Sequence, residues 1–339
     1  MLTMLLELAL LAASGWGLSH AVRCYALKAQ VVDIPGERSS HSQVTPRGGG
    51  LAIVICAAFY AIYLAVQTPS LMAWLLAIFL PASLLGLFSF IDDHRPLSRR
   101  LRMLVHMACA ALFLYLLPNA SNLQLGPYSI AINSFWALPF SLIAISWLIN
   151  LYNFMDGIDG IAATEAISLL LGLQVIITAN GAGFDQILMG LAAIISGFLF
   201  INWAPAKIFM GDIGSCFLGL ALAAVACYCS VYYQISLWSA IILLATFIYD
   251  ASWTLLYRIL SKQAWNEPHR SHSYQILSRR WESHNKVVCA MLAINILWLL
   301  PLAIVAAYFP AWGAIIFAAA CVPLATIGHS LKAGHKSQL

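Results

Sequence analysis

Apolar residues occur along this chain in runs of about twenty, separated by short polar segments. A helix needs about 20 apolar residues to cross a bilayer, so each run predicts one membrane span. The pattern predicts eleven spans, at approximately 1–22, 48–67, 71–91, 103–117, 131–149, 160–179, 186–203, 213–232, 235–257, 287–308 and 311–331. We therefore expect an all-α, polytopic membrane protein whose residues 1–339 form a single integral-membrane domain.

The positive charges fix the expected orientation. The eleven spans place segments 23–47, 92–102, 150–159, 204–212, 258–286 and 332–339 on one side of the membrane, and these segments contain all 17 Lys and Arg residues. By the positive-inside rule that side is cytoplasmic. The N-terminus is then outside and the C-terminus inside, and the loops on the outer side carry Asp185 as their only charge.

Composition excludes a water-soluble fold. The chain is 62% hydrophobic and 9% charged, whereas soluble domains average about 25% charged residues. The net charge of +4 says less than the placement of the charges, because nearly all polar chemistry lies at one membrane face. Membrane lipid is thus an expected partner and nucleic acid is not.

Paired acids end the third predicted span. Asp92 and Asp93 are adjacent and are followed by four arginines within nine residues. Neighbouring carboxylates at a low-dielectric boundary repel each other, and a divalent cation or a shared proton relieves the repulsion. The alternative is a polar flank that merely stops the span.

A second group places four oxygen-bearing side chains three residues apart: Asn150, Asn153, Asp156 and Asp159. Such a row drifts around a helix, so we expect Gly157 and Gly160 to open the backbone and let the oxygens converge. Converging hard oxygen ligands suit Mg²⁺ or Mn²⁺, or hydrogen bonds to a nucleotide base and ribose. The alternative is a turn without a ligand.

Two glycine-rich segments precede further spans. In the first, Gly211 and Gly214 bracket Asp212, downstream of Asn202, where a helix N-terminus favours phosphate or the acid serves as an N-cap. In the second, an element that begins at Asp33 and passes through His41 leads to Arg47 and three consecutive glycines. The triple glycine predicts either an anion-binding turn or close helix packing.

The longest cytoplasmic segment contains Pro268-His269-Arg270-Ser271-His272-Ser273-Tyr274-Gln275. Two histidines and one arginine suit contacts with a pyrophosphate or a sugar. A basic loop that binds lipid headgroups is the alternative. All five motifs immediately precede even-numbered spans, so their helix N-termini should gather around a polyanion at one surface.

Together these motifs resemble those of the polyprenyl-phosphate N-acetylhexosamine-1-phosphate transferases. The resemblance covers most of the chain and rests on Asp92-Asp93, on residues 150–160 and on residues 209–215, with residues 268–272 similar to the variable histidine loop of enzymes that initiate O-antigen or related polysaccharides. It implies about eleven helices, a location in the bacterial inner membrane, a Mg²⁺-dependent reaction, a UDP-amino sugar as donor and undecaprenyl phosphate as acceptor. A homodimer is usual for the family.

The resemblance also assigns roles. Asp212 and Asn153 would hold Mg²⁺, Asp159 and Asn202 would lie near the uridine with Asp156 beside them, and Asp92 and Asp93 would face the lipid phosphate. The expected catalytic residues are Asp92, Asp93 and Asp212. The expected substrate-binding residues are Arg47, Asn150, Asp156, Asp159, Asn202, His269, Arg270 and His272.

One departure and two rivals bear on this hypothesis. The peptidoglycan branch has a Lys shortly after the paired acids and a His-rich triplet, whereas Arg95-Pro96 follows here, which argues against a muramoyl-pentapeptide donor. A transporter of an anionic solute would place its polar residues near the membrane midplane, and Asp250 is the main such residue. A CDP-alcohol phosphotransferase would carry a denser Asp motif on one helix.

Overall fold

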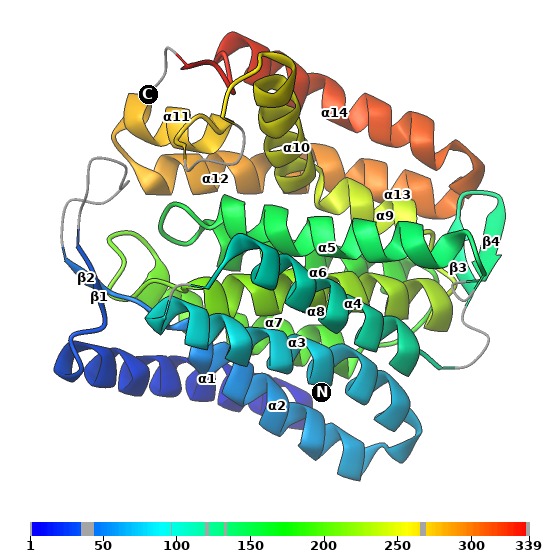
Figure 1. The fold of residues 1–339 in the computed structure, drawn as a ribbon. Helices are drawn as coiled ribbons and strands as arrows, with labels where there is room; N and C mark the ends of the chain where they lie inside the picture. The colour runs from blue at the N-terminus through cyan, green and yellow to red at the C-terminus, as the bar shows by residue number, and fades with distance from the viewer. Residues whose placement is uncertain are drawn as a thin grey trace.

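The computed structural model describes residues 2–34, 44–95, 97–118, 122–131, 134–264 and 269–336. Parts of three predicted motifs lie outside these ranges, among them His41, Pro96 and Pro268. The described residues form a helical bundle, which confirms the all-α prediction, and two small two-stranded antiparallel sheets (Figure 1).

The first half of the bundle has this order: α1 (Leu2–Lys28), β1 (Val32–Asp33), β2 (Thr45–Pro46), α2 (Gly50–Gln67), η1 (Pro69–Leu71), α3 (Met72–His94), α4 (Arg99–Leu116), β3 (Asn122–Leu125), β4 (Tyr128–Ala131), α5 (Ala137–Met155) and α6 (Ile161–Ala179). Strand β1 pairs with β2, with Val32 opposite Pro46, and β3 pairs with β4, with Leu125 opposite Tyr128. The sheets therefore close two local loops.

The second half consists of α7 (Gln186–Asn202), α8 (Asp212–Tyr232), α9 (Leu237–Leu243), α10 (Ala245–Leu260), α11 (Ser273–Trp281), α12 (His284–Ile294), the π-helical turn η2 (Asn295–Leu299), α13 (Leu300–Tyr308), η3 (Pro310–Trp312) and α14 (Gly313–Ser330). Helix α8 is the centre of the bundle: it packs against α3, α5 and α2, and nearly all of its residues are buried (Figure 1). Helices α1 and α14 lie toward opposite sides of the bundle.

Each predicted span overlaps one helix or one run of consecutive helices. Within the described ranges, eight of these are long and apolar enough to cross a membrane, and a ninth results if α9 and α10 count as one span. The remaining two are α7, which is apolar but only 17 residues long, and α4, whose first turn carries Arg99, Arg100 and Arg102. The polytopic fold is thus confirmed, whereas the count of eleven and the orientation stay predictions.

Two spans differ in detail from the prediction. The chain bends by 73° between α9 and α10, and neither Pro nor Gly marks the bend at Leu244. Helix α5 is shifted to 137–155, so Asn150 and Asn153 lie on the helix instead of in a loop. Within this helix, Asn150 Nδ2 donates a hydrogen bond to Ser146 O, one turn earlier.

Orientation can be tested by labelling. Tyr128, on the β3–β4 hairpin, and Arg280, near the end of α11, are exposed and should lie on opposite sides of the membrane. In a chain whose native cysteines have been replaced, we expect Tyr128→Cys to react with an impermeant maleimide in intact cells and Arg280→Cys to react only after permeabilisation. Labelling of Arg280→Cys in intact cells would overturn the topology.

Candidate active site

A polar cleft of about 310 Å³ opens where the N-termini of several helices meet. Its walls come from the segment before α2, the α5–α6 turn, the start of α8, and the beginnings of α11 and α12. Six predicted site residues line it: Arg47, Asn153, Asp156, Asp159, Asn202 and Asp212. Residues up to 251 positions apart in sequence thus share one site, as the predicted gathering of helix N-termini requires, with Asp33 and His284 as the two extremes.

Glycines allow the starts of α2 and α8 to approach each other closely beside the cleft. Gly49 N and Gly50 N donate hydrogen bonds to Phe209 O and Met210 O, at 2.8 and 2.9 Å. A side chain on Gly50 would overlap the backbone of Gly214. These contacts favour close packing as the role of the triple glycine, because two of its N–H groups already have backbone partners.

Arg47 lies between two acids, the buried Asp93 and the cleft residue Asp212. Arg47 Nη2 makes an ion pair with Asp93 Oδ1 and lies 4.0 Å from Asp212 Oδ1. The Asp93 side chain is only 3% exposed, and its Oδ2 is buried without a hydrogen-bond partner in the described part of the chain. Arg47 therefore neutralises part of the negative charge of the site, but Asp93 Oδ2 keeps its capacity to accept a hydrogen bond or to bind a cation.

Asp92 has a different set of partners. Its Oδ2 lies 2.5 Å from Arg102 Nε, and its Oδ1 accepts a hydrogen bond from Leu97 N at 2.7 Å. The two adjacent acids are thus each paired with their own arginine, which relieves their repulsion without a shared proton. Asp92 is part of the α3–α4 corner, while Asp93 is directed toward Arg47 and Asp212.

The motif of residues 150–159 spans the end of α5 and the turn to α6, and Asn153, Asp156 and Asp159 line the cleft whereas Asn150 does not. Gly160 has a φ of +76°, a left-handed conformation that begins the new helix as the sequence predicted. Asn153 Nδ2 donates to Ser215 Oγ at 3.1 Å, which ties α5 to α8. Asn150 instead contacts His106 Nδ1, at 3.1 Å, between α4 and α5.

Asp159 and Asn202 connect the α5–α6 turn to the segment between α7 and α8. Asp159 Oδ2 accepts a hydrogen bond from Ala206 N at 3.0 Å and lies 3.2 Å from His284 Nδ1. Asn202 Oδ1 accepts from Gly160 N, and its Nδ2 donates to Ile208 O. Both side chains line the cleft and also brace the loops that form it.

The sequence motifs missed one cleft residue, His284, whereas Gln275 is the last residue of the motif that begins at Pro268. His284 follows a short polar segment at the start of a helix, which is the same signal that identified the motifs. Asp33, from the element that leads to the three consecutive glycines, and Ser215, from the segment that contains Asp212, also line the cleft.

Negative charge accumulates at Asp156. Burial, followed by the charges of Asp212, Asp159 and Asp93, raises its pKa from 3.8 to about 7, while Arg47 acts in the opposite sense. The folded chain thus binds this proton more tightly than the unfolded chain, so this group should make the protein less stable as pH rises from about 4 to 7.

Asp156→Asn should flatten that part of a Tm-against-pH curve measured without divalent cations. An unchanged slope would show that Asp156 does not carry the effect.

The donor set fits a Mg²⁺ ion that is completed by phosphate. Among the described residues, no three His, Cys, Asp or Glu side chains form a ready-made cage. Mg²⁺ commonly takes only one or two carboxylates from the protein and fills its shell with water and substrate phosphates. Asp212, with 31% of its side chain exposed, and Asn153 offer such oxygens, and the mutual repulsion of the acids favours a cation.

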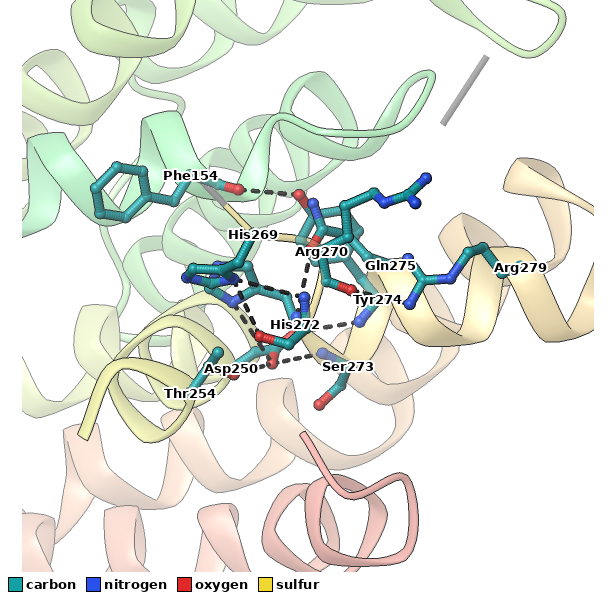
Figure 2. Close-up of polar contacts among 11 residues, drawn as sticks. Phe154, Asp250, Thr254, His269, Arg270, His272, Ser273, Tyr274, Gln275 and Arg279 are labelled. Atoms are coloured by element: carbon teal, nitrogen blue, oxygen red, sulfur yellow. Dashed lines mark hydrogen bonds and ion pairs between the residues drawn. The ribbon is translucent and has the colours of Figure 1, made fainter. Parts of the chain in front are cut away.

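The histidine loop lies beside the cleft and is packed against α10. His272 is buried, its ring faces the ring of His269 at 4.9 Å, and Ser271 Oγ lies 3.1 Å from His269 Nδ1 (Figure 2). Burial lowers the pKa of His269 to about 3, so this imidazole is neutral. The Arg270 side chain is directed away from the two rings. None of His269, Arg270 and His272 lines the cleft of the described residues, so their contact with a donor stays a prediction.

Comparison with known proteins supports the resemblance found in the motifs. The profile of glycosyl transferase family 4 matches residues 75–230, which include both paired acids and Asp212. The chain is 29% identical to a probable undecaprenyl-phosphate N-acetylglucosaminyl 1-phosphate transferase of Bacillus subtilis, over 82% of this chain and 78% of the relative.

Two other relatives match over shorter stretches, each at 32% identity. One is the decaprenyl-phosphate N-acetylglucosaminephosphotransferase of Mycolicibacterium smegmatis, covering 63% of this chain and 56% of the relative. The other is a phospho-N-acetylmuramoyl-pentapeptide-transferase of a Synechococcus species, covering 60% of each chain. The chain thus spans under two thirds of the length of these two relatives.

Proposed function

We propose that the chain is a polyprenyl-phosphate N-acetylhexosamine-1-phosphate transferase of glycosyl transferase family 4, and that it moves an N-acetylated amino-sugar-1-phosphate from a UDP-sugar to undecaprenyl phosphate. The observation that carries this proposal is the cleft lined by Arg47, Asn153 and Asp212, in which Arg47 is paired with the buried Asp93. We place this cleft at the cytoplasmic face of the bacterial inner membrane, with the reaction feeding O-antigen or a related envelope polysaccharide.

The proposed reaction is a displacement at phosphorus. An oxygen of the lipid phosphate attacks the β-phosphorus of the UDP-sugar, the bond between that phosphorus and the oxygen bridging to the α-phosphorus breaks, and UMP leaves. Lipid-diphosphate-sugar is the other product. A phosphate monoester has a second pKa near 6 and is largely ionised at neutral pH, so little help from a general base is needed.

Each side chain has a part in this proposal. Asp212 and Asn153 would hold Mg²⁺, which when bound would neutralise charge on the transferring phosphoryl group. Arg47 is a cation between Asp93 and Asp212, well placed to bind phosphate oxygens. Asp93 and Asp92 would organise the acceptor side, and Asp156, Asp159 and Asn202 the nucleotide side.

A transporter remains the second candidate function. Asp250 is a buried acid within a broken helix, which is a feature of transporters. In this chain, however, Asp250 bonds to the start of α11, and the cleft acids lie at the ends of helices. Transfer chemistry therefore accounts for more of the polar residues.

The donor is tested by a panel of UDP-sugars. Purified enzyme should convert undecaprenyl phosphate with one or more of UDP-N-acetylglucosamine, UDP-N-acetylgalactosamine, UDP-N-acetylfucosamine and UDP-N-acetylquinovosamine, and should reject the muramoyl-pentapeptide donor. Equal or better use of the muramoyl donor would contradict the assignment.

Arg270 provides a test of the histidine loop. If its guanidinium binds phosphate through two hydrogen bonds, Arg270→Lys should lower kcat/KM although the charge is kept. Losing one charge-assisted contact costs about 2–3 kcal/mol, or roughly 30- to 150-fold in rate. Steady-state kinetics, with Arg280→Lys on the same cytoplasmic segment as the control, should separate the two variants. Equal kinetics would remove the loop from the donor site.

A further inference from the structure

Asp250 is a buried acid to which the proposed chemistry assigns no role. It lies in α10 and is 7% exposed. Its Oδ1 accepts a hydrogen bond from Ser273 N at 2.8 Å, and its Oδ2 accepts one from Tyr274 N at 3.2 Å (Figure 2). These are the first two N–H groups of α11, and such groups have no partner within their own helix. Asp250 therefore caps α11 from a different helix.

The surroundings of Asp250 leave this cap as its main interaction. Thr254 Oγ1 donates a longer hydrogen bond to Oδ1, at 3.3 Å, and His272 Nδ1 lies 3.9 Å from the same oxygen. Burial lowers the pKa of His272, so its imidazole is neutral near pH 7 and does not compete as a cation. The positive end of α11 favours a carboxylate at this position.

The helix that Asp250 caps contacts the cleft directly. Tyr274 OH donates a hydrogen bond to Phe154 O at 2.9 Å (Figure 2). The same hydroxyl occupies the space beside Gly157, where any side chain would overlap it. Gly157 belongs to the turn that carries Asp156 and Asp159, and the next residue of α11, Gln275, lines the cleft. The start of α11 is therefore part of the cleft wall.

We propose that Asp250 is a positioning residue for the donor side of the active site. It holds the first turn of α11, which sets Tyr274 against the turn of residues 156–159 and Gln275 against the cleft. Its effect passes through α11, because Asp250 lies outside the cleft lining in the described part of the chain. The inference rests on the proposed function for the identity of the donor.

Asp250→Asn tests the cap with little change in shape. An amide can still accept one hydrogen bond, but it loses the charge and cannot accept both backbone bonds in the same way. We expect the KM for the UDP-sugar to rise about 10- to 100-fold, as for the loss of a charge-assisted hydrogen bond, with the KM for lipid phosphate unchanged. Thr254→Val is the matched control, since it removes only the longer bond to Asp250 and should leave both KM values within about twofold.

A double-mutant cycle separates positioning from general damage. Tyr274→Phe removes the hydroxyl that reaches Phe154 and should raise the donor KM by the same route. The combined variant should then lose little more than the worse single variant, because both act on one connection. Additive losses, or an equal rise in both KM values together with a lower Tm, would overturn the inference.

The two proposals fail in different ways. If the unaltered enzyme transfers no sugar phosphate from any UDP-sugar, the proposed function is wrong. If the unaltered enzyme is active and Asp250→Asn keeps a normal donor KM, the function stands and only the positioning role is wrong.

Discussion

Asp212→Asn is expected to abolish transfer while the chain still inserts into the membrane. Asp212 begins α8, lines the cleft and lies 4.0 Å from Arg47, and it is the predicted ligand of Mg²⁺. Removing a metal ligand forfeits several kcal/mol of charge stabilisation, which corresponds to roughly a 10³-fold fall in kcat. The measurement is single-turnover transfer at several Mg²⁺ concentrations.

The control for Asp212 is Glu282→Gln, an exposed carboxylate in the same predicted cytoplasmic segment as the histidine loop. It should insert equally well and keep normal activity, which would show that loss of a surface charge is harmless. Near-normal transfer by Asp212→Asn in saturating Mg²⁺ would exclude its role as a ligand.

Asp93→Asn should have the second largest effect, a loss of about 10²- to 10³-fold in transfer, as for removal of a preorganised electrostatic group. Asp93 is the buried partner of Arg47, and replacing it leaves that guanidinium without its ion pair. Arg47 would then move or bind phosphate in a different geometry. Transfer rates with lipid phosphate, measured on protein whose Tm has been checked, decide the outcome.

Asp93→Asn should also lower the stability of the protein, but by less than the about 3–5 kcal/mol that breaking a fully buried ion pair costs, because the Arg47 side chain is 34% exposed. Asp93→Asn with Arg47→Gln removes both charges and should recover part of the Tm without recovering activity. If activity returns together with stability, the pair has a structural role and Asp93 takes no part in the reaction.

The helices were predictable because their driving force is local. Runs of apolar residues set where each span lies, and the cleft forms where the polar segments between spans meet, so six of the predicted residues meet there. Gly160 shows how much one residue can indicate: its left-handed backbone separates α5 from α6, as its place in the motif predicted.

Features that depend on tertiary contacts were not predictable in the same way. The bend at Leu244 carries no sequence signal, and only the fold brings the start of α11 to Asp250. Asn150 has the same spacing as Asn153, yet it contacts His106, because α5 continues past the predicted end and rotates its side chain away from the cleft. Spacing alone does not reveal such a rotation.

The central claim is that phosphorus, and not the sugar carbon, is attacked. The most direct measurement uses a UDP-sugar labelled in its β-phosphate, together with undecaprenyl phosphate and Mg²⁺. We expect the label to enter the lipid fraction in a one-to-one ratio with the sugar while UMP is released into water. Release of UDP, with the label remaining in the aqueous phase, would contradict the account, because it would mean that the bond to the sugar carbon had broken.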